Sequence, residues 1–115
     1  MTKLDQTAID FMKSKGYRVY MRNRADSYAI FEKAGRLGYV QTERAGGYRL
    51  SSVHKPNKDT GTGFAIRELP VDLTAANLEQ ASNMVAPHWA RRPEKFAGID
   101  EYRAHSRFHA QYAEV

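Results

Sequence analysis

The sequence predicts an α+β fold: an N-terminal helix, a five-stranded antiparallel meander sheet and two C-terminal helices, in a single domain over residues 1–115. Three observations carry this prediction. Apolar residues recur at helical spacing at both ends of the chain, they alternate in the centre, and glycine-containing turns divide the centre into short segments. Short connections favour antiparallel pairing, and such a sheet can also curl toward a small barrel. We expect the helices to pack on one face of the sheet.

The first helix is expected over residues 4–15, where Leu4, Ala8 and Met12 fall on one helical face. Gly16 follows, and glycine commonly ends a helix because it adopts the left-handed conformation easily.

The central segments are predicted strands, at residues 17–22, 27–33, 37–42, 48–54 and 64–68. In the first strand, Arg18, Tyr20 and Arg22 share a face that we expect in solvent, because the positions between them belong to the opposite face. The pairs Ala34-Gly35 and Gly46-Gly47 predict turns, since glycine takes positive φ without strain.

Two helices are predicted after the sheet. The first covers residues 74–85, where a capping threonine precedes a leucine-containing apolar stripe, and a proline follows. We expect Trp89, in the irregular stretch beyond it, to be buried. The last helix is expected over residues 100–112, with Phe108 and Tyr112 on its apolar side.

Composition limits the function. The 115 residues include no cysteine, which excludes disulfides, thiolate metal ligands and a cysteine nucleophile. No apolar run approaches the ~20 residues that span a bilayer, so we expect no membrane partner. The first residues lack the apolar stretch of a secretory signal, and a cytoplasmic location is expected.

The net charge of +5 is concentrated in the centre. Residues 13–67 hold twelve Lys and Arg against four Asp and Glu, a balance of +8, whereas residues 70–115 hold five against six, a balance of −1. A basic centre favours a nucleic acid or another acidic partner.

Tyrosine and arginine alternate along the predicted strands, a combination that stacks bases and contacts phosphates on exposed sheets. Tyr20 and Tyr48 are the strongest stacking candidates because arginines flank them. Tyrosine is also a good strand former, so a structural role stays open. The predicted contact residues are Arg18, Tyr20, Arg22, Tyr48, Arg49, His54, Lys55 and Lys58.

The loop at residues 54–63 carries two lysines, a histidine and two glycines. Its Gly61-Thr62-Gly63 lacks the Gly-Lys-Ser/Thr that completes a P-loop and the third glycine of a dinucleotide-binding turn. Both a hairpin loop and an anion or ligand contact stay open for this segment.

Catalytic and metal-binding patterns are weak. His105 and His109 have the spacing of two ligands on one helical face, but no third ligand follows nearby in the sequence. The acids near the basic centre are isolated, and the serines lack a nucleophile elbow. We therefore expect no catalytic residues, no metal and no cofactor.

The order of several short motifs over residues 28–90 resembles a pattern in small uncharacterised proteins of tailed bacteriophages. The motifs are Gly38-Tyr39-Val40, Gly46-Gly47-Tyr48, Ser52 to Asn57, Gly61 to Phe64 and Pro87-His88-Trp89-Ala90. The resemblance implies a phage accessory protein in a bacterial cytoplasm and assigns no site residue.

Together these observations predict a non-enzymatic basic accessory domain that contacts nucleic acid through a strand and loop face, mainly by electrostatics. The alternative is a protein-interaction module or inhibitor that binds an acidic surface of a host protein. An enzyme or small-ligand binder built on the 54–63 loop ranks third.

Overall fold

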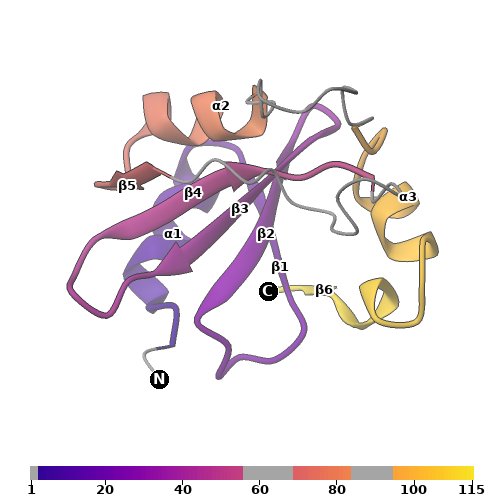
Figure 1. The fold of residues 1–115 in the computed structure, drawn as a ribbon, viewed down its shortest axis with the longest axis horizontal. Coiled ribbons are helices and arrows are strands. Elements are labelled where there is room, and N and C mark those ends of the chain that lie inside the picture. The colour runs from indigo at the N-terminus through magenta and orange to yellow at the C-terminus, as the bar shows by residue number, and fades with distance from the viewer. Residues whose placement is uncertain (1–2, 56–68, 84–94) are drawn as a thin grey trace.

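The computed structural model describes residues 3–55, 69–83 and 95–115 (Figure 1). It confirms the predicted α+β class, with a helix before an open antiparallel sheet and helices after it. The elements are α1 (Gln6–Ser14), β1 (Arg18–Met21), β2 (Tyr28–Lys33), β3 (Arg36–Thr42), β4 (Tyr48–Ser52), β5 (Leu69–Val71), α2 (Ala75–Asn83), α3 (Ile99–Ala104), the 3-10 helix η1 (His109–Gln111) and β6 (Ala113–Glu114).

The ends of α1 follow from its sequence. Asp5 caps the helix, because its Oδ1 accepts a hydrogen bond of 2.7 Å from the backbone N–H of Ala8, a group with no partner inside the helix. Gly16 lies just beyond the C-terminus with a φ of +90°, in the left-handed region that favours glycine. The first predicted helix is thus confirmed within two residues.

The described strands lie in the order β5-β4-β3-β2-β1-β6, and each neighbouring pair is antiparallel. Ala34 and Gly35, with φ of +53° and +78°, form the two-residue turn between β2 and β3, so that Lys33 pairs with Arg36. Gly46 and Gly47 also have positive φ in the turn before β4. Both turns stand where the glycines predict them.

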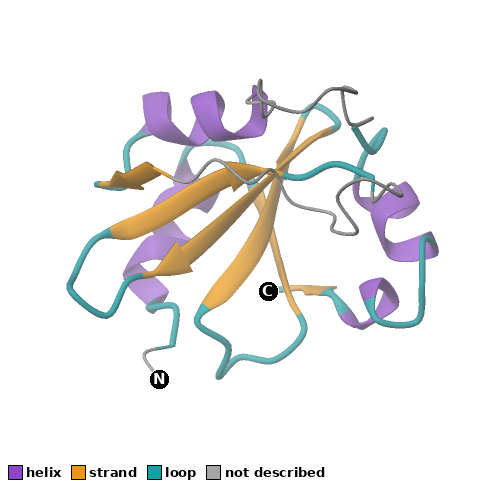
Figure 2. Cartoon of the chain, in the orientation of Figure 1, coloured by secondary structure: helices purple, strands orange, loops and turns teal. Residues whose placement is uncertain are grey.

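Helices cover both faces of the sheet, and the expectation of a single covered face is wrong. Alternate strand residues point to opposite faces, so Phe31 joins the core under α1 and α2, while Ile30 joins a second core with α3. Figure 2 shows α1 and α2 grouped together and α3 apart from them. The second core contains Tyr20, Ile30, Leu37, Val53, Phe96, Ile99, Tyr102 and Tyr112.

The last predicted helix is also wrong beyond Ala104. The chain leaves α3 there, and Ser106 Oγ accepts a hydrogen bond from the backbone N–H of His109 at the start of η1. Tyr112 is 0% exposed and its hydroxyl donates to the Tyr28 hydroxyl at 3.2 Å, whereas Phe108 is 42% exposed. Residues 113–114 then pair with β1 as a sixth strand, because their backbone satisfies that strand's open edge.

The predicted strand at 64–68 and the predicted burial of Trp89 fall on residues outside the described part of the chain. A strand is present slightly later, at Leu69–Val71, and pairs with β4. Its Pro70 has no N–H to donate, which an edge strand tolerates.

Candidate binding surface

The strand face predicted to be in solvent is partly covered. Tyr20 is 4% exposed and belongs to the second core, where Ile99, Tyr102 and Tyr112 from the C-terminal part of the chain pack over the sheet. Its neighbour across the strands, Ile30, is 0% exposed. A base cannot stack on a ring that is already buried, so Tyr20 is not an available stacking platform.

The described residues of the predicted loop site are engaged within the chain. His54 is 2% exposed, and its Nδ1 lies 2.8 Å from the carbonyl oxygen of Lys55, which accepts when Nδ1 is protonated. Lys55 Nζ forms an ion pair of 3.2 Å with Glu101 Oε1. Lys58 lies outside the described residues. The side chain of His54 is therefore not exposed to a partner in this structure.

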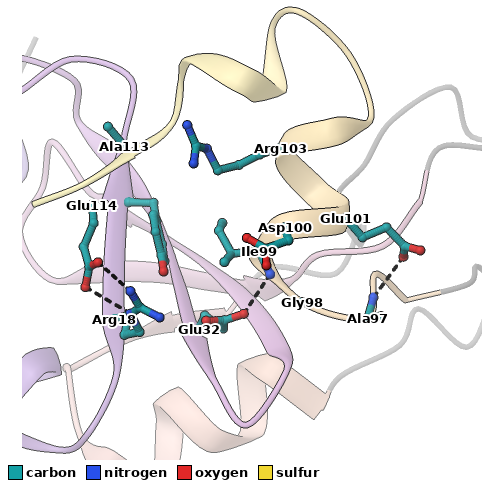
Figure 3. Close-up of a pocket in the computed structure, with 11 residues that line it drawn as sticks. Arg18, Glu32, Ala97, Gly98, Ile99, Asp100, Glu101, Arg103, Ala113 and Glu114 are labelled. Carbon is teal, nitrogen blue, oxygen red and sulfur yellow. Dashed lines mark hydrogen bonds and ion pairs between the residues drawn. The ribbon is translucent and has the colours of Figure 1, made fainter.

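Arg18 borders a hollow of about 660 Å³ between β1, β6 and α3 (Figure 3). It hydrogen-bonds Glu114 twice, from Nη2 to Oε1 at 2.7 Å and from Nε to Oε2 at 3.1 Å. This pairing lowers the pKa of Glu114. Glu32 is paired directly with Arg18 in the neighbouring strand, and its Oε2 accepts a hydrogen bond of 2.7 Å from the backbone N–H of Ile99.

Carboxylates outnumber guanidinium groups in the lining of this hollow. The described lining holds four acidic side chains and two basic ones: Glu32, Asp100, Glu101 and Glu114, against Arg18 and Arg103. Its charge is therefore opposite in sign to the basic centre expected from the sequence. A polyanion would be repelled here, so the hollow around Arg18 does not suit a nucleic-acid backbone.

Tyr48 and Arg49 point to opposite faces of the sheet because they are consecutive strand residues. Tyr48 packs against the core under α1, and its hydroxyl donates to Asp5 Oδ2 at 3.0 Å. Burial, followed by this acceptor, raises the pKa of Tyr48. Arg49 lies on the other face and forms an ion pair with Glu43. The predicted contact residues therefore do not form one continuous surface.

A different group of partly exposed side chains gathers at the end of the sheet away from α3. Tyr28 and Gln41 are paired in β2 and β3, and Gln41 is paired in turn with Arg49 of β4. Tyr39 lies diagonal to Tyr28 on the same face. We call this surface the aromatic patch; it consists of Arg22, Tyr28, Tyr39, Gln41, Arg49 and Phe108.

Two tyrosine rings form the centre of the aromatic patch. The ring centroids of Tyr28 and Tyr39 are 5.4 Å apart, and their planes are tilted by 34°. The guanidinium carbon of Arg22 lies 5.8 Å from the centroid of Tyr28 and 4.8 Å from that of Phe108. These distances are within the range of cation–π contacts. Arg22 also forms an ion pair of 3.4 Å with Asp26.

The sequence pattern of alternating tyrosine and arginine includes Tyr28 and Tyr39, but the predicted contact residues include Arg22 and Arg49 and not these two tyrosines. The prediction of Tyr48 rests on its adjacent arginine, although adjacent strand residues face opposite sides. The strand period was the signal that could have identified Tyr28 and Tyr39 as the pair sharing a face with Arg49.

The two neighbouring histidines belong to an aromatic cluster. The rings of His105 and His109 are 5.0 Å apart, and His109 lies edge-on to Tyr102 at 4.5 Å. Burial, followed by the charge of His105, lowers the pKa of His109. Within the described residues, no three His, Asp or Glu side chains are grouped as metal ligands would be.

Comparisons with known proteins identify no relative: no family model matches the chain, and neither a curated protein nor a solved structure shows significant similarity to it. The bacteriophage resemblance therefore stays a prediction. In the described part of the chain, no helix has the length and apolar character needed to cross a membrane.

Proposed function

We propose that the chain is a non-enzymatic accessory domain that contacts single-stranded nucleic acid through the aromatic patch. The observation that carries the proposal is the partly exposed Tyr28–Tyr39 pair, with the Arg22 guanidinium over one of its rings. Unpaired bases stack on such rings whatever their sequence, and each stacked base contributes about 1–3 kcal/mol.

The ion pairs of the patch change the expected balance of forces. Arg22 already faces Asp26 and Arg49 already faces Glu43, so a phosphate must compete with a carboxylate at each position. Two phosphate contacts on a single strand correspond to a log–log salt slope of about −1.4. We therefore propose binding dominated by stacking, rather than the mainly electrostatic binding expected from the net charge.

The test is a titration of a short fluorescent single-stranded oligonucleotide, as DNA and as RNA, followed by anisotropy. Tyr39→Leu should weaken binding about tenfold, because it removes a stacking ring and keeps an apolar side chain in place. Arg22→Gln should flatten the salt slope by about 0.7. Tyr48→Leu is the matched control, since this partly exposed tyrosine lies on the other face of the sheet.

Equal losses from Tyr39→Leu and Tyr48→Leu would contradict the proposed surface. Absence of oligonucleotide binding by the unaltered protein at low salt would contradict nucleic acid as the partner.

The exposed Phe108 beside Arg22 favours the second candidate, an accessory protein that binds a host protein, since aromatic and arginine side chains dominate interface hot spots. A stoichiometric protein partner that survives nuclease treatment and is lost with Phe108→Ala would support that candidate.

A further inference from the structure

Basic side chains also gather at the opposite end of the sheet, around the β2–β3 turn. The tight turn at Ala34-Gly35 places Lys33 and Arg36 directly opposite each other. Directly paired strand residues project to the same face, here the face that carries α1 and α2. The turn thus delivers two cationic side chains to the place where these two helices end.

The ammonium groups of Lys33 and of one further lysine, Lys95, reach the ends of these helices. Lys33 Nζ donates to the carbonyl oxygen of Lys15 at the end of α1, at 3.1 Å. Lys95 Nζ donates to the carbonyl oxygen of Ser82 in the last turn of α2, at 3.2 Å. Lysine side chains commonly donate hydrogen bonds to the last carbonyl oxygens of helices, and this accounts for the positions of Lys33 and Lys95. Helix capping does not account for the position of Arg36, for which the described residues provide no ion-pair partner.

A cavity of about 170 Å³ opens between these groups, lined by Tyr17, Lys33, Ala34, Arg36, Glu79 and Ser82. Among the described residues, Glu79 is the one carboxylate in the lining, and no ion pair joins it to Arg36 or to the lysines. Three cations, Lys33, Arg36 and Lys95, therefore lie beside one anion, since Lys95 contacts the end of α2 at Ser82.

The cationic groups are close enough to repel one another. Burial lowers the pKa of Lys95, and the charge of Arg36 lowers it further. Burial and the charge of Glu79 raise the pKa of Tyr17, so its hydroxyl keeps its proton at neutral pH and can donate a hydrogen bond. A bound anion would offset the repulsion and accept from these donors.

We propose that this cavity is a binding site for a phosphate group, separate from the aromatic patch on the other face. A planar guanidinium beside an ammonium group suits the oxygens of phosphate, which accept from both. The volume is below the ~300 Å³ at which pockets for drug-sized ligands begin, so the cavity accommodates the phosphate group and not a whole nucleotide.

The experiment is calorimetric titration of the full chain with inorganic phosphate and with pyrophosphate, at constant ionic strength set by chloride. Saturable one-to-one binding is expected. Arg36→Gln should weaken it about tenfold, because a charge-assisted hydrogen bond is lost. Glu79→Gln should tighten it several-fold, since the substitution removes the one described carboxylate that repels the anion and preserves the shape of the side chain.

Arg44→Gln is the control, because Arg44 is an exposed arginine in the turn before β4, at the other end of the strands. Equal effects of Arg44→Gln and Arg36→Gln, or no saturable binding, would overturn the proposal. The phosphate can be free or can terminate an oligonucleotide, and paired titrations with and without a 5′-phosphate distinguish these sources. If the 5′-phosphate increases the affinity for the oligonucleotide and Arg36→Gln abolishes this increase, the phosphate that binds is the terminal phosphate of an oligonucleotide. Tyr39→Leu should leave pyrophosphate binding unchanged, which separates this site from the proposed function.

Discussion

Gly38 in β3 lies against the ring of Phe31 in β2, and replacing it by alanine tests how tightly the first core is packed. The two residues are paired across the strands. A Cβ atom at position 38 would lie less than 3.0 Å from three ring carbons, Cζ, Cε2 and Cε1. Phe31 is 0% exposed and packs edge-on against Tyr17, with 5.4 Å between ring centroids. The ring can therefore move only by displacing other core side chains.

The magnitude follows from this geometry. Forcing an extra carbon into a filled core costs about 1–3 kcal/mol. Complete expulsion of the ring sets the upper limit, about 3–5 kcal/mol, as in removal of a buried phenylalanine. Gly38 does not have a positive φ, so backbone strain adds nothing to the cost. We expect Gly38→Ala to lower the free energy of unfolding by about 2–4 kcal/mol.

Urea unfolding followed by circular dichroism measures this cost. In a Phe31→Leu background, Gly38→Ala should cost less than half as much, because the colliding ring is gone. Gly46→Ala is the control: its φ is +99° and no atom lies within 4 Å of the added carbon. Its cost should be about 1–2 kcal/mol from backbone strain alone, and Phe31→Leu should not change it. A cost for Gly38→Ala that is equal in both backgrounds would refute the packing argument.

The C-terminal part of the second core allows two further tests. Glu32→Ala leaves the partly buried N–H of Ile99 without its acceptor, so hydrogen exchange at this amide should accelerate and stability should fall by about 1–3 kcal/mol; unchanged exchange would exclude a capping role. Burial raises the pKa of Tyr102 to about 12 from 10.0, so the unfolded chain loses this proton first as pH rises. Stability should therefore fall between these pH values, by up to about 3 kcal/mol, and Tyr102→Phe should make the fall shallower; an unaltered alkaline slope would contradict this.

The parts of the fold predicted from the sequence depend on neighbouring residues. Asp5 and Gly16 bound α1, and Ala34-Gly35 closes a hairpin, because each of these features is satisfied within a few residues. The spacing of Tyr112 predicts a helix, yet this residue is buried through a contact with Tyr28, 84 residues earlier in the chain. Sequence periodicity carries no information about a contact between residues so far apart. The covering of the second face of the sheet depends on such contacts, so the sequence pattern did not predict it.

The residue types of the candidate site could be predicted from the sequence, but its location on the fold could not. The basic centre is real in the sequence, but Arg18 and Lys55 pair with Glu114 and Glu101, acids from the C-terminal part of the chain. A count of charges along the sequence cannot anticipate pairs formed by folding. The face of a strand residue follows from its period, so the positions of Tyr28 and Tyr39 were within reach, whereas the burial of Tyr20 was not.

The pairing of β6 with β1 has a consequence for how the chain matures during synthesis. The strands β1 to β4 are joined by short turns and can pair as soon as they emerge from the ribosome. The outer edge of β1 is completed much later, because the residues that pair with it lie far along the chain; the backbone N–H of Val115, for example, donates to the carbonyl oxygen of Val19. Until then β1 exposes unpaired backbone groups, which other chains can bind. The nascent chain is thus most prone to aggregate in this interval, and a slower or faster synthesis of residues 113–115 should change the yield of folded protein.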